Sequence, residues 1–147
     1  TILAIGNNYI RQRLSRDLDL KYTHAIHKKA IISDFSSTGE GSVVLANAVI
    51  NANSHIGKHV IINTSAVVEH DCVIGDHTHI SPHATLCGNV KVGKLSHIGA
   101  GAVINPGISI GKNTIIGSGS TVIHDIPDNV VAVGNPAKVI KANPNKP

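Results

Sequence analysis

The chain repeats a six-residue pattern over most of its length. Steps of six from Ile26 to Val122 meet an aliphatic residue at every position except Thr38. Four residues after most of these positions stands a small residue, such as Ala48 or Ala102. A strict hexapeptide period is neither helical nor a simple alternation, and it is typical of a parallel β-helix, in which each unit forms one short strand and one turn. The repeat therefore predicts a mainly β protein.

Three such units close one triangular coil. A coil then takes eighteen residues, and residues eighteen apart in the sequence stack directly above one another. From residue 26 to about residue 127 this gives five to six coils. Aromatic residues make up only 2% of the 147 residues, so we expect Ile, Val and Leu to fill the axis while small residues fit the corners.

The two ends of the chain depart from the repeat and set the domain boundaries. Residues 1–22 predict an apolar strand, a Gly-Asn-Asn turn and a helix, which together resemble the last βα unit of a larger domain. The expected buried face of this helix consists of Ile10, Leu14, Leu18 and Leu20. Residues 23–132 form the β-helix, and residues 133–147 predict a short crossing strand with a lysine-bearing tail. Because the chain starts inside such a unit, we expect a preceding N-terminal piece.

Composition excludes several classes of protein. No run of eighteen apolar residues and no apolar leader is present, so we expect a cytoplasmic protein without a membrane partner. The net charge is +4, but the basic residues are scattered and aromatic residues for base stacking are scarce, so we expect no nucleic-acid partner. Cys72 and Cys87 match no zinc spacing and are too few for a disulfide framework, which favours two reduced thiols.

One stretch, VVEHDCVIGDHTHI (67–80), adds acids and imidazoles to the repeat. His70 is the third residue of its hexapeptide and should face outward. Eighteen residues further on stands Gly88, whose missing side chain leaves a notch above the imidazole and exposes backbone amides. A neutral imidazole can take a proton from an attacking amine or hydroxyl, and a nearby amide can stabilise an oxyanion. The pair therefore predicts acyl transfer.

Two carboxylates flank this histidine. Either Glu69 or Asp71 can fix the imidazole tautomer as the third member of a catalytic triad does, and the sequence does not choose between them. Both also fit a solvated strand edge.

Two columns of imidazole follow from the eighteen-residue spacing. His59 stacks with His77, and His79 stacks with His97. A zinc lyase of the gamma carbonic anhydrase type uses such a prism, but it needs three protein ligands and an open position, and the histidine spacings here do not supply the expected pair. We expect no metal.

Residues 63–93, NTSAVVEHDCVIGDHTHISPHATLCGNVKVG, and residues 133–140, VGNPAKVI, resemble the left-handed β-helix acetyltransferases of the bacterial PglD/NeuD group. These enzymes acetylate sugars for surface glycans. The resemblance implies an acetyl-CoA-dependent homotrimer with active sites between neighbouring prisms and direct attack without an acyl-enzyme. It also implies, as acceptor, the 4-amino group of a UDP-linked amino-dideoxy sugar of the bacillosamine type.

The resemblance assigns roles by position. His70 matches the general base and Asp71 its acidic partner. The expected cofactor-binding residues are His79 and Gly88, at the thioester and pantetheine arm, Ala100 and Ser118, along the rest of the cofactor, and Lys138, near phosphate.

On the acceptor side, Asn63 matches a polar residue of the sugar pocket. Gly6 and Asn7, with Asn8 beside them, match contacts to the acceptor nucleotide. In the family a Rossmann-like N-terminal domain with a glycine-rich loop holds this nucleotide, and that loop is absent from the sequence here.

Two further functions compete with this one. The same base and notch would serve a hydroxyl, which gives O-acetylation of sialic acid or a related sugar. A non-catalytic structural prism is the other alternative, although such a prism has no need for His70 beneath Gly88.

Overall fold

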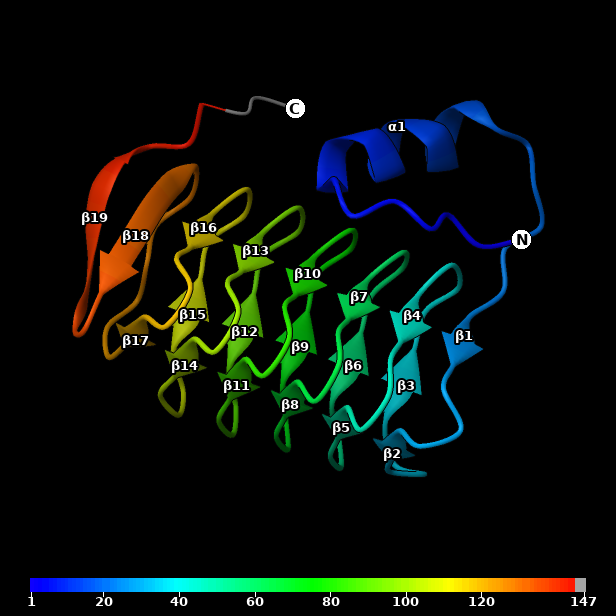
Figure 1. Cartoon of the computed structure of the whole chain (residues 1–147), viewed down its shortest axis with the longest axis horizontal. Coiled ribbons are helices and arrows are strands. Elements are labelled where there is room, and N and C mark those ends of the chain that lie inside the picture. Colours follow the sequence, from blue (N-terminus) through cyan, green and yellow to red (C-terminus); the bar gives the residue numbers. More distant parts are fainter. Residues whose placement is uncertain (145–147) are drawn as a thin grey trace.

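A computed structural model describes residues 1–144. It contains one helix, α1 (Asn8–Asp17), followed by a solenoid of short strands and a terminal hairpin (Figure 1). The strands are β1 (Ala25–Ile26), β2 (Ile31–Ile32), β3 (Ser37–Thr38), β4 (Val43–Val44), β5 (Val49–Ile50), β6 (His55–Ile56), β7 (Ile61–Ile62), β8 (Val67–Val68), β9 (Val73–Ile74), β10 (His79–Ile80), β11 (Thr85–Leu86), β12 (Lys91–Val92), β13 (His97–Ile98), β14 (Val103–Ile104), β15 (Ser109–Ile110), β16 (Ile115–Ile116), β17 (Thr121–Val122), β18 (Val130–Gly134) and β19 (Ala137–Ala142).

Three sheets form the sides of the solenoid. The eight-stranded sheet has the order β1-β4-β7-β10-β13-β16-β18-β19, the six-stranded sheet the order β17-β14-β11-β8-β5-β2, and the five-stranded sheet the order β15-β12-β9-β6-β3. Within the solenoid each strand pairs in parallel with the strand one coil away, as Thr85 does with Val67 on one side and Val103 on the other. The predicted parallel β-helix of about six turns is thus confirmed.

The aliphatic residues of the repeat form the core. Every axial residue from Val44 to Val122 is buried, and small residues such as Ala48 and Ala102 are fully buried at the corners. The first coil differs from the expectation: Ile26 is 45% exposed and Thr38 is half-buried. These side chains have a neighbouring coil on one side only.

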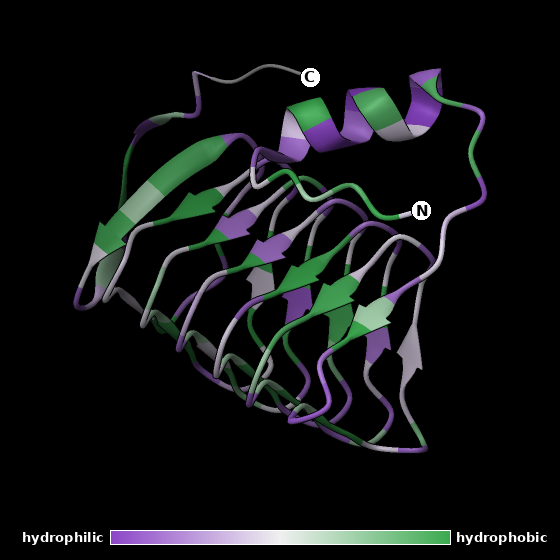
Figure 2. Ribbon diagram, turned by 45° about the vertical axis from the view of Figure 1, so that its right-hand side comes forward, coloured by the Kyte–Doolittle hydropathy of each residue, from purple (hydrophilic) through white to green (hydrophobic). Residues whose placement is uncertain are grey.

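The expected strand at the N-terminus does not form. Residues 1–5 run as extended chain across the outer face of the eight-stranded sheet and beneath α1, where Figure 2 shows them as a largely hydrophobic segment. Leu3 is buried against this face. Because the segment crosses the strands instead of running beside an edge, its backbone has no strand to pair with.

The prediction of an apolar buried face on the helix is also wrong. Asn7 caps α1 by accepting hydrogen bonds from two backbone N–H groups, and the helix ends at Asp17. Ile10 is 41% exposed, and Leu18 and Leu20 lie beyond the helix and are exposed as well. The buried residues of the helix are Asn8 and Arg11.

Polar contacts attach α1 to the solenoid. The Arg11 guanidinium, 1% exposed, donates to the carbonyls of His59 at 2.8 Å, His77 at 2.7 Å and Ile5 at 2.8 Å. Asn8 donates to the carbonyls of Leu95 and Ser96. Burial lowers the pKa of Arg11 to about 10, so the side chain stays charged and the carbonyls compensate for its lost hydration.

The C-terminal segment forms an antiparallel hairpin where one crossing strand was expected. β18 pairs in parallel with β16 and extends the eight-stranded sheet, and β19 pairs with β18. The last three residues of the expected tail, 145–147, lie outside the described part of the chain. Within residues 1–144 no helix has the length and apolar character needed to cross a membrane.

Candidate active site

His70 and Asp71 lie in the turn between β8 and β9, at the edge where the six-stranded and five-stranded sheets meet. The imidazole Nδ1 and the carboxylate Oδ2 are 2.8 Å apart, and the two side chains are 62% and 51% exposed. Because an ionised carboxylate only accepts hydrogen bonds, Nδ1 carries the proton in this contact. The lone pair of the neutral ring is therefore on Nε2.

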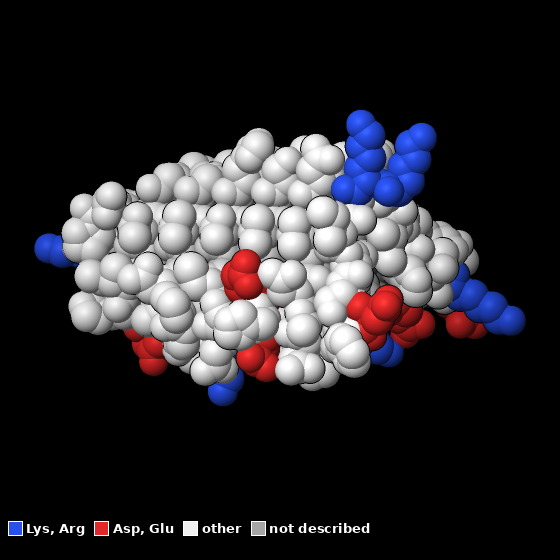
Figure 3. Space-filling model, turned by 90° about the horizontal axis from the view of Figure 1, so that it is seen from below, with Lys and Arg blue, Asp and Glu red and all other residues white. Residues whose placement is uncertain are grey.

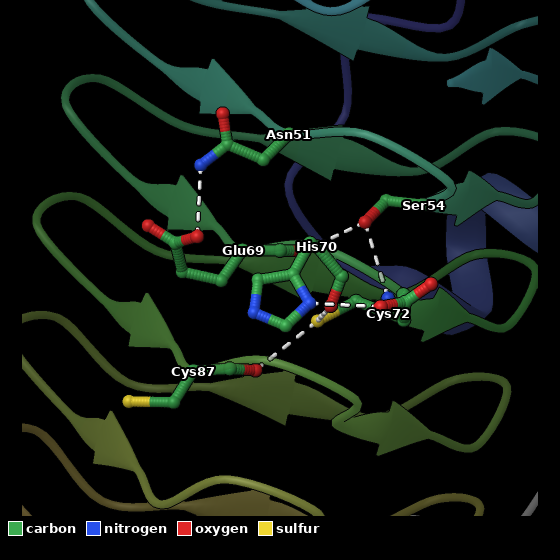
Figure 4. Close-up of polar contacts among 7 residues, drawn as sticks. Asn51, Ser54, Glu69, His70, Cys72 and Cys87 are labelled. Atoms are coloured by element: carbon green, nitrogen blue, oxygen red, sulfur yellow. Dashed lines mark hydrogen bonds and ion pairs between the residues drawn. The ribbon is translucent and has the colours of Figure 1, made fainter. Parts of the chain in front are cut away.

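The structure distinguishes the two flanking carboxylates. The hydrogen bond with His70 lowers the pKa of Asp71, and the nearby Asn53 side chain lowers it further. The Glu69 carboxylate instead accepts from the Asn51 amide at 2.9 Å, and Figure 4 shows it turned toward Asn51. Asp71 is the carboxylate in contact with the imidazole.

Gly88 lies one coil away, in the turn between β11 and β12, and stacks on His70 as the eighteen-residue spacing predicts. A Cβ added at Gly88 would stand 2.6 Å from both Cε1 and Nε2 of the imidazole. The Asn89 N–H donates to the His70 carbonyl, whereas the Gly88 N–H has no acceptor within residues 1–144. A notch with a free backbone donor thus adjoins Nε2.

The two cysteines lie close to this turn (Figure 4). Both are free thiols, and the Cys72 Sγ lies 3.2 Å from the Cys87 carbonyl oxygen. Cys72 is fully buried, and burial raises the pKa of its thiol. It is therefore a small core residue of the corner.

Three other predicted residues meet on the eight-stranded sheet. Gly6, Asn63 and His79 line a groove of about 490 Å³ between the N-terminal segment and the sheet. The Asn63 amide nitrogen and His79 Nε2 are 3.0 Å apart. Burial, together with the nearby His97 and Arg11, lowers the pKa of His79 to about 4, so this ring is neutral at neutral pH. Asn7 lines a second cavity, of about 340 Å³, with Gly6.

The predicted residues further up the coils lie on another edge. Ala100 follows β13 and Ser118 follows β16, and both are exposed where the eight-stranded and six-stranded sheets meet. The Gly119 N–H donates to the Ala100 carbonyl, so the two turns stack. Lys138 is exposed on β19.

Within one chain, the predicted site residues therefore lie on separate edges of the prism. His70, Asp71 and Gly88 occupy one edge of the six-stranded sheet, and Ala100 and Ser118 occupy the other. His79 lies on the eight-stranded sheet, which is the side of the triangle opposite the His70 edge. Within a single prism these groups are kept apart by the core.

The six-stranded sheet that joins these edges presents an uncharged face. Its outward residues form a single column of β-branched side chains: Ile31, Val49, Val67, Thr85, Val103 and Thr121. Figure 3 shows this side of the molecule almost free of charge, with charged side chains mainly at its ends and along one margin.

The two imidazole columns form as expected. The rings of His59 and His77 stack with centroids 5.1 Å apart, and those of His79 and His97 meet edge to face at 4.8 Å. Across residues 1–144 no three His, Cys, Asp or Glu side chains are grouped so that they could hold a metal ion. Sequence reasoning missed Arg11, because it belongs to no motif and only the fold reveals its partners.

Comparison with known proteins identifies the family. The bacterial transferase hexapeptide (six repeats) model matches residues 53–88, 71–106 and 89–124. The acetyltransferase domain of PglB from Neisseria gonorrhoeae is 40% identical with a TM-score of 0.92, over 95% of this chain and 69% of that one. The chain belongs to the hexapeptide-repeat β-helix acetyltransferases. The resemblance to the PglD/NeuD group is thereby confirmed.

Other relatives of this acetyltransferase have been solved with ligands. PerB from Caulobacter crescentus, in complex with CoA and GDP-perosamine, is 45% identical with a TM-score of 0.92, over 95% of this chain and 69% of that one. The Neisseria domain is also known in complex with acetyl coenzyme A. WeeI from Acinetobacter baumannii is 33% identical with a TM-score of 0.91 over the same shares. No curated protein sequence matches the chain.

Proposed function

We propose that this acetyltransferase moves the acetyl group of acetyl-CoA to an amino group of a nucleotide-linked sugar, and that the acceptor is the 4-amino group of a UDP-linked amino-dideoxy sugar of the bacillosamine type. The observation that carries the proposal is the His70–Asp71 pair beneath the notch at Gly88. The CoA and sugar-nucleotide ligands of the PglB domain and PerB support the two substrates.

In this mechanism His70 is the general base. The acceptor amine attacks the thioester carbon, and Nε2 takes the proton that the nitrogen loses as the N–C bond forms. Asp71 holds the tautomer and stabilises the imidazolium. The tetrahedral intermediate then expels the CoA thiolate as the C–S bond breaks, and the imidazolium returns its proton to the sulfur.

The notch provides the second requirement. The oxyanion of the intermediate needs a fixed donor, and the Gly88 N–H has no other acceptor in the described chain. Any side chain at this position would fill the space above Nε2. Gly88 thus serves both as a donor and as an opening for the thioester.

The active enzyme is a homotrimer in this proposal. Three prisms with the uncharged six-stranded faces toward a common axis place the His70 edge of one copy beside the Ala100 edge of the next. The neighbour then contributes His79, Ala100, Ser118 and Lys138 to the cofactor site. Without such a neighbour, these cofactor-binding residues lie away from His70, on the other side of the same prism.

The acceptor nucleotide is assigned to residues 1–22, which we regard as the end of a nucleotide-sugar-binding domain. Gly6 and Asn7 line adjacent cavities at the start of α1, and Asn63 lies in the groove below them. These residues contact the acceptor in the proposal, and Arg11 fixes the segment by bonding the Ile5 carbonyl.

Product analysis tests the reaction. Purified protein is supplied with acetyl-CoA and, in parallel, UDP-4-amino-4,6-dideoxy-N-acetylglucosamine, GDP-perosamine or sialic acid. An acetyl mass increase on the UDP sugar that survives mild base identifies an amide. A base-labile ester on sialic acid overturns N-acetylation, and exclusive use of GDP-perosamine overturns the UDP assignment.

Subunit mixing tests the shared site. His70→Ala removes the base, and Ala100→Trp blocks the opposite edge. If the site lies between copies, co-refolded mixtures of the two inactive variants contain interfaces with both halves intact and recover about a quarter of wild-type activity. No recovery despite mixed trimers would place the whole site within one chain.

A further inference from the structure

A single carboxylate interrupts the uncharged face of the six-stranded sheet. The residues that directly follow its strands form a second column beside the β-branched one, and all of them are at least partly exposed: Ser33, Asn51, Glu69, Cys87, Asn105 and Ile123. Glu69 is the only acidic or basic residue in the two columns. Figure 3 shows an acidic group standing within this otherwise uncharged area.

Only one oxygen of this carboxylate has a partner. The Asn51 side-chain amide donates to Oε2 of Glu69 at 2.9 Å, whereas Oε1 accepts no hydrogen bond from residues 1–144. Glu69 is half-buried already, and in the proposed homotrimer its face turns toward the other copies. A carboxylate that loses water needs further donors. Oε1 is therefore an acceptor that awaits a donor from outside the chain.

This acceptor lies on the side of the turn to which the base is directed. Nδ1 of His70 contacts Asp71, so Nε2 is on the opposite edge of the ring. Figure 4 shows this second nitrogen of His70, which carries no dashed line, on the same side as the Glu69 carboxylate. A nucleophile that gives its proton to Nε2 thus reacts next to Glu69.

We propose that Glu69 contacts the acceptor amine and makes the enzyme selective for amines over hydroxyls. The inference rests on the proposed acetyl transfer and deepens it. A neutral amine has two N–H groups and one lone pair. As the lone pair forms the N–C bond, one proton passes to His70 Nε2, and the other N–H donates to Oε1 of Glu69 and remains on the amide product. Glu69 thereby orients the lone pair toward the thioester carbon.

A hydroxyl cannot satisfy both acceptors. Its single O–H is needed at Nε2 of His70, so the oxygen would present its remaining lone pair to the negatively charged Oε1 of Glu69. That contact is repulsive, and a site that leaves a buried acceptor unpaired discriminates strongly against the wrong substrate. The arrangement therefore disfavours ester formation.

Glu69→Gln is the primary test because it changes one oxygen into a donor while keeping the shape of the side chain. With the Asn51 amide still donating to the side-chain oxygen, the new NH₂ group takes the place of Oε1. The acceptors are UDP-4-amino-4,6-dideoxy-N-acetylglucosamine and its 4-hydroxyl analogue, or GDP-perosamine and its 4-hydroxyl analogue if wild type uses only the GDP sugar.

We expect the substitution to shift selectivity in both directions. In Glu69→Gln, kcat/KM for the amine should fall roughly 10- to 100-fold, as for loss of a hydrogen bond to a charged group. The rate with the hydroxyl should rise about tenfold, because the NH₂ group can donate to the oxygen. The amine-to-hydroxyl ratio should therefore fall by at least about 100-fold.

Glu40→Gln is the matched control. Glu40 is the other glutamate of the chain, and it pairs with Lys58 at 2.7 Å in a turn that joins the five-stranded and eight-stranded sheets. Its loss removes the same charge from a different edge. The wild-type ratio and rates are expected in this variant, and light scattering should show the same oligomer for wild type and both variants.

Each outcome decides a separate point. If wild type acetylates the amine and Glu69→Gln keeps both its rate and its selectivity, the role of Glu69 is wrong and acetyl transfer stands. Loss of the oligomer in Glu69→Gln alone would show that the carboxylate bonds a neighbouring copy instead of the acceptor. Wild type that acetylates only the hydroxyl, or neither acceptor, would overturn the proposed function and the selectivity with it.

Discussion

Replacing Gly88 by alanine tests the notch with the smallest possible change. The new Cβ would stand 2.6 Å from Cε1 and Nε2 of His70, well inside the contact distance of two carbon atoms. Gly88 does not have a left-handed backbone, so alanine is acceptable to the main chain. His70 is 62% exposed, and the imidazole can swing toward solvent without disturbing the core.

We expect the substitution to lower the catalytic rate much more than the stability. General-base catalysis contributes a rate enhancement of roughly 10²- to 10⁴-fold, and a displaced base loses most of it. A misplacement of about 1 Å alone lowers the rate about 10²-fold. We therefore expect kcat to fall by roughly 10²- to 10³-fold in Gly88→Ala. The free energy of unfolding should change by less than about 1 kcal/mol, because the side chain is added at a solvated turn.

The assay is acetyl-CoA turnover in Gly88→Ala, His70→Ala and the double variant, with urea unfolding of each. If the methyl group acts through the imidazole, the double variant has the rate of His70→Ala alone, since the base can be lost only once. A wild-type kcat in Gly88→Ala would refute the claim that catalysis needs the notch above His70. Multiplying losses in the double variant would show that Gly88 acts independently of His70.

Three further predictions concern the other groups. Asp71→Asn should lower kcat by roughly 10²- to 10⁴-fold at unchanged stability, because an amide can donate to Nδ1 and favour the wrong tautomer; an active variant would contradict the role of Asp71. Burial lowers the folded-state pKa of His77 and His79 to about 4, below the unfolded value near 6.5. Between these two pH values the unfolded chain binds more protons than the folded chain. The free energy of unfolding should therefore fall as pH drops from 6.5 to 4, by about 3 kcal/mol per histidine at most. Urea midpoints between pH 7 and 4 measure this, and a flat profile would contradict it. Arg11→Leu should destabilise the chain by about 3 kcal/mol in urea unfolding by leaving buried carbonyls unpaired, whereas an unchanged midpoint would show that the contacts contribute nothing.

The coils and the catalytic pair could be predicted because contacts in a solenoid have a fixed sequence separation. The position of Gly88 above His70 follows from counting eighteen residues, and the same count gives the His79–His97 column. In most folds no such rule relates residues that meet in space. The repeat thus allows some tertiary contacts to be predicted from sequence separation alone.

The N-terminal segment could not be predicted in the same way. Ile10 and Leu18 suggested an apolar helix face, but α1 docks through Arg11 and Asn8 to backbone carbonyls, which carry no sequence signal. The strand expected in residues 1–5 fails for a related reason, since β structure requires a partner edge and the segment crosses the strands. Both errors concern how the segment is placed on the solenoid.

The choice between Glu69 and Asp71 also needed the structure. The two acids are adjacent to His70 in sequence, yet the corner directs Glu69 toward Asn51 and Asp71 toward the imidazole. Asp71 has a left-handed backbone, with φ of 60°, and its carboxylate lies 2.8 Å from the imidazole. Sequence supplied the candidates, and the turn geometry selected one.

Thiol release from acetyl-CoA, with UDP-4-amino-4,6-dideoxy-N-acetylglucosamine as acceptor, tests the central claim most directly when wild type is compared with His70→Ala. Acceptor-dependent release by wild type and a rate lower by roughly 10²- to 10⁴-fold in the variant are predicted. Release at the same rate by both proteins would contradict the assignment of His70 as the base of an amine acetyltransferase.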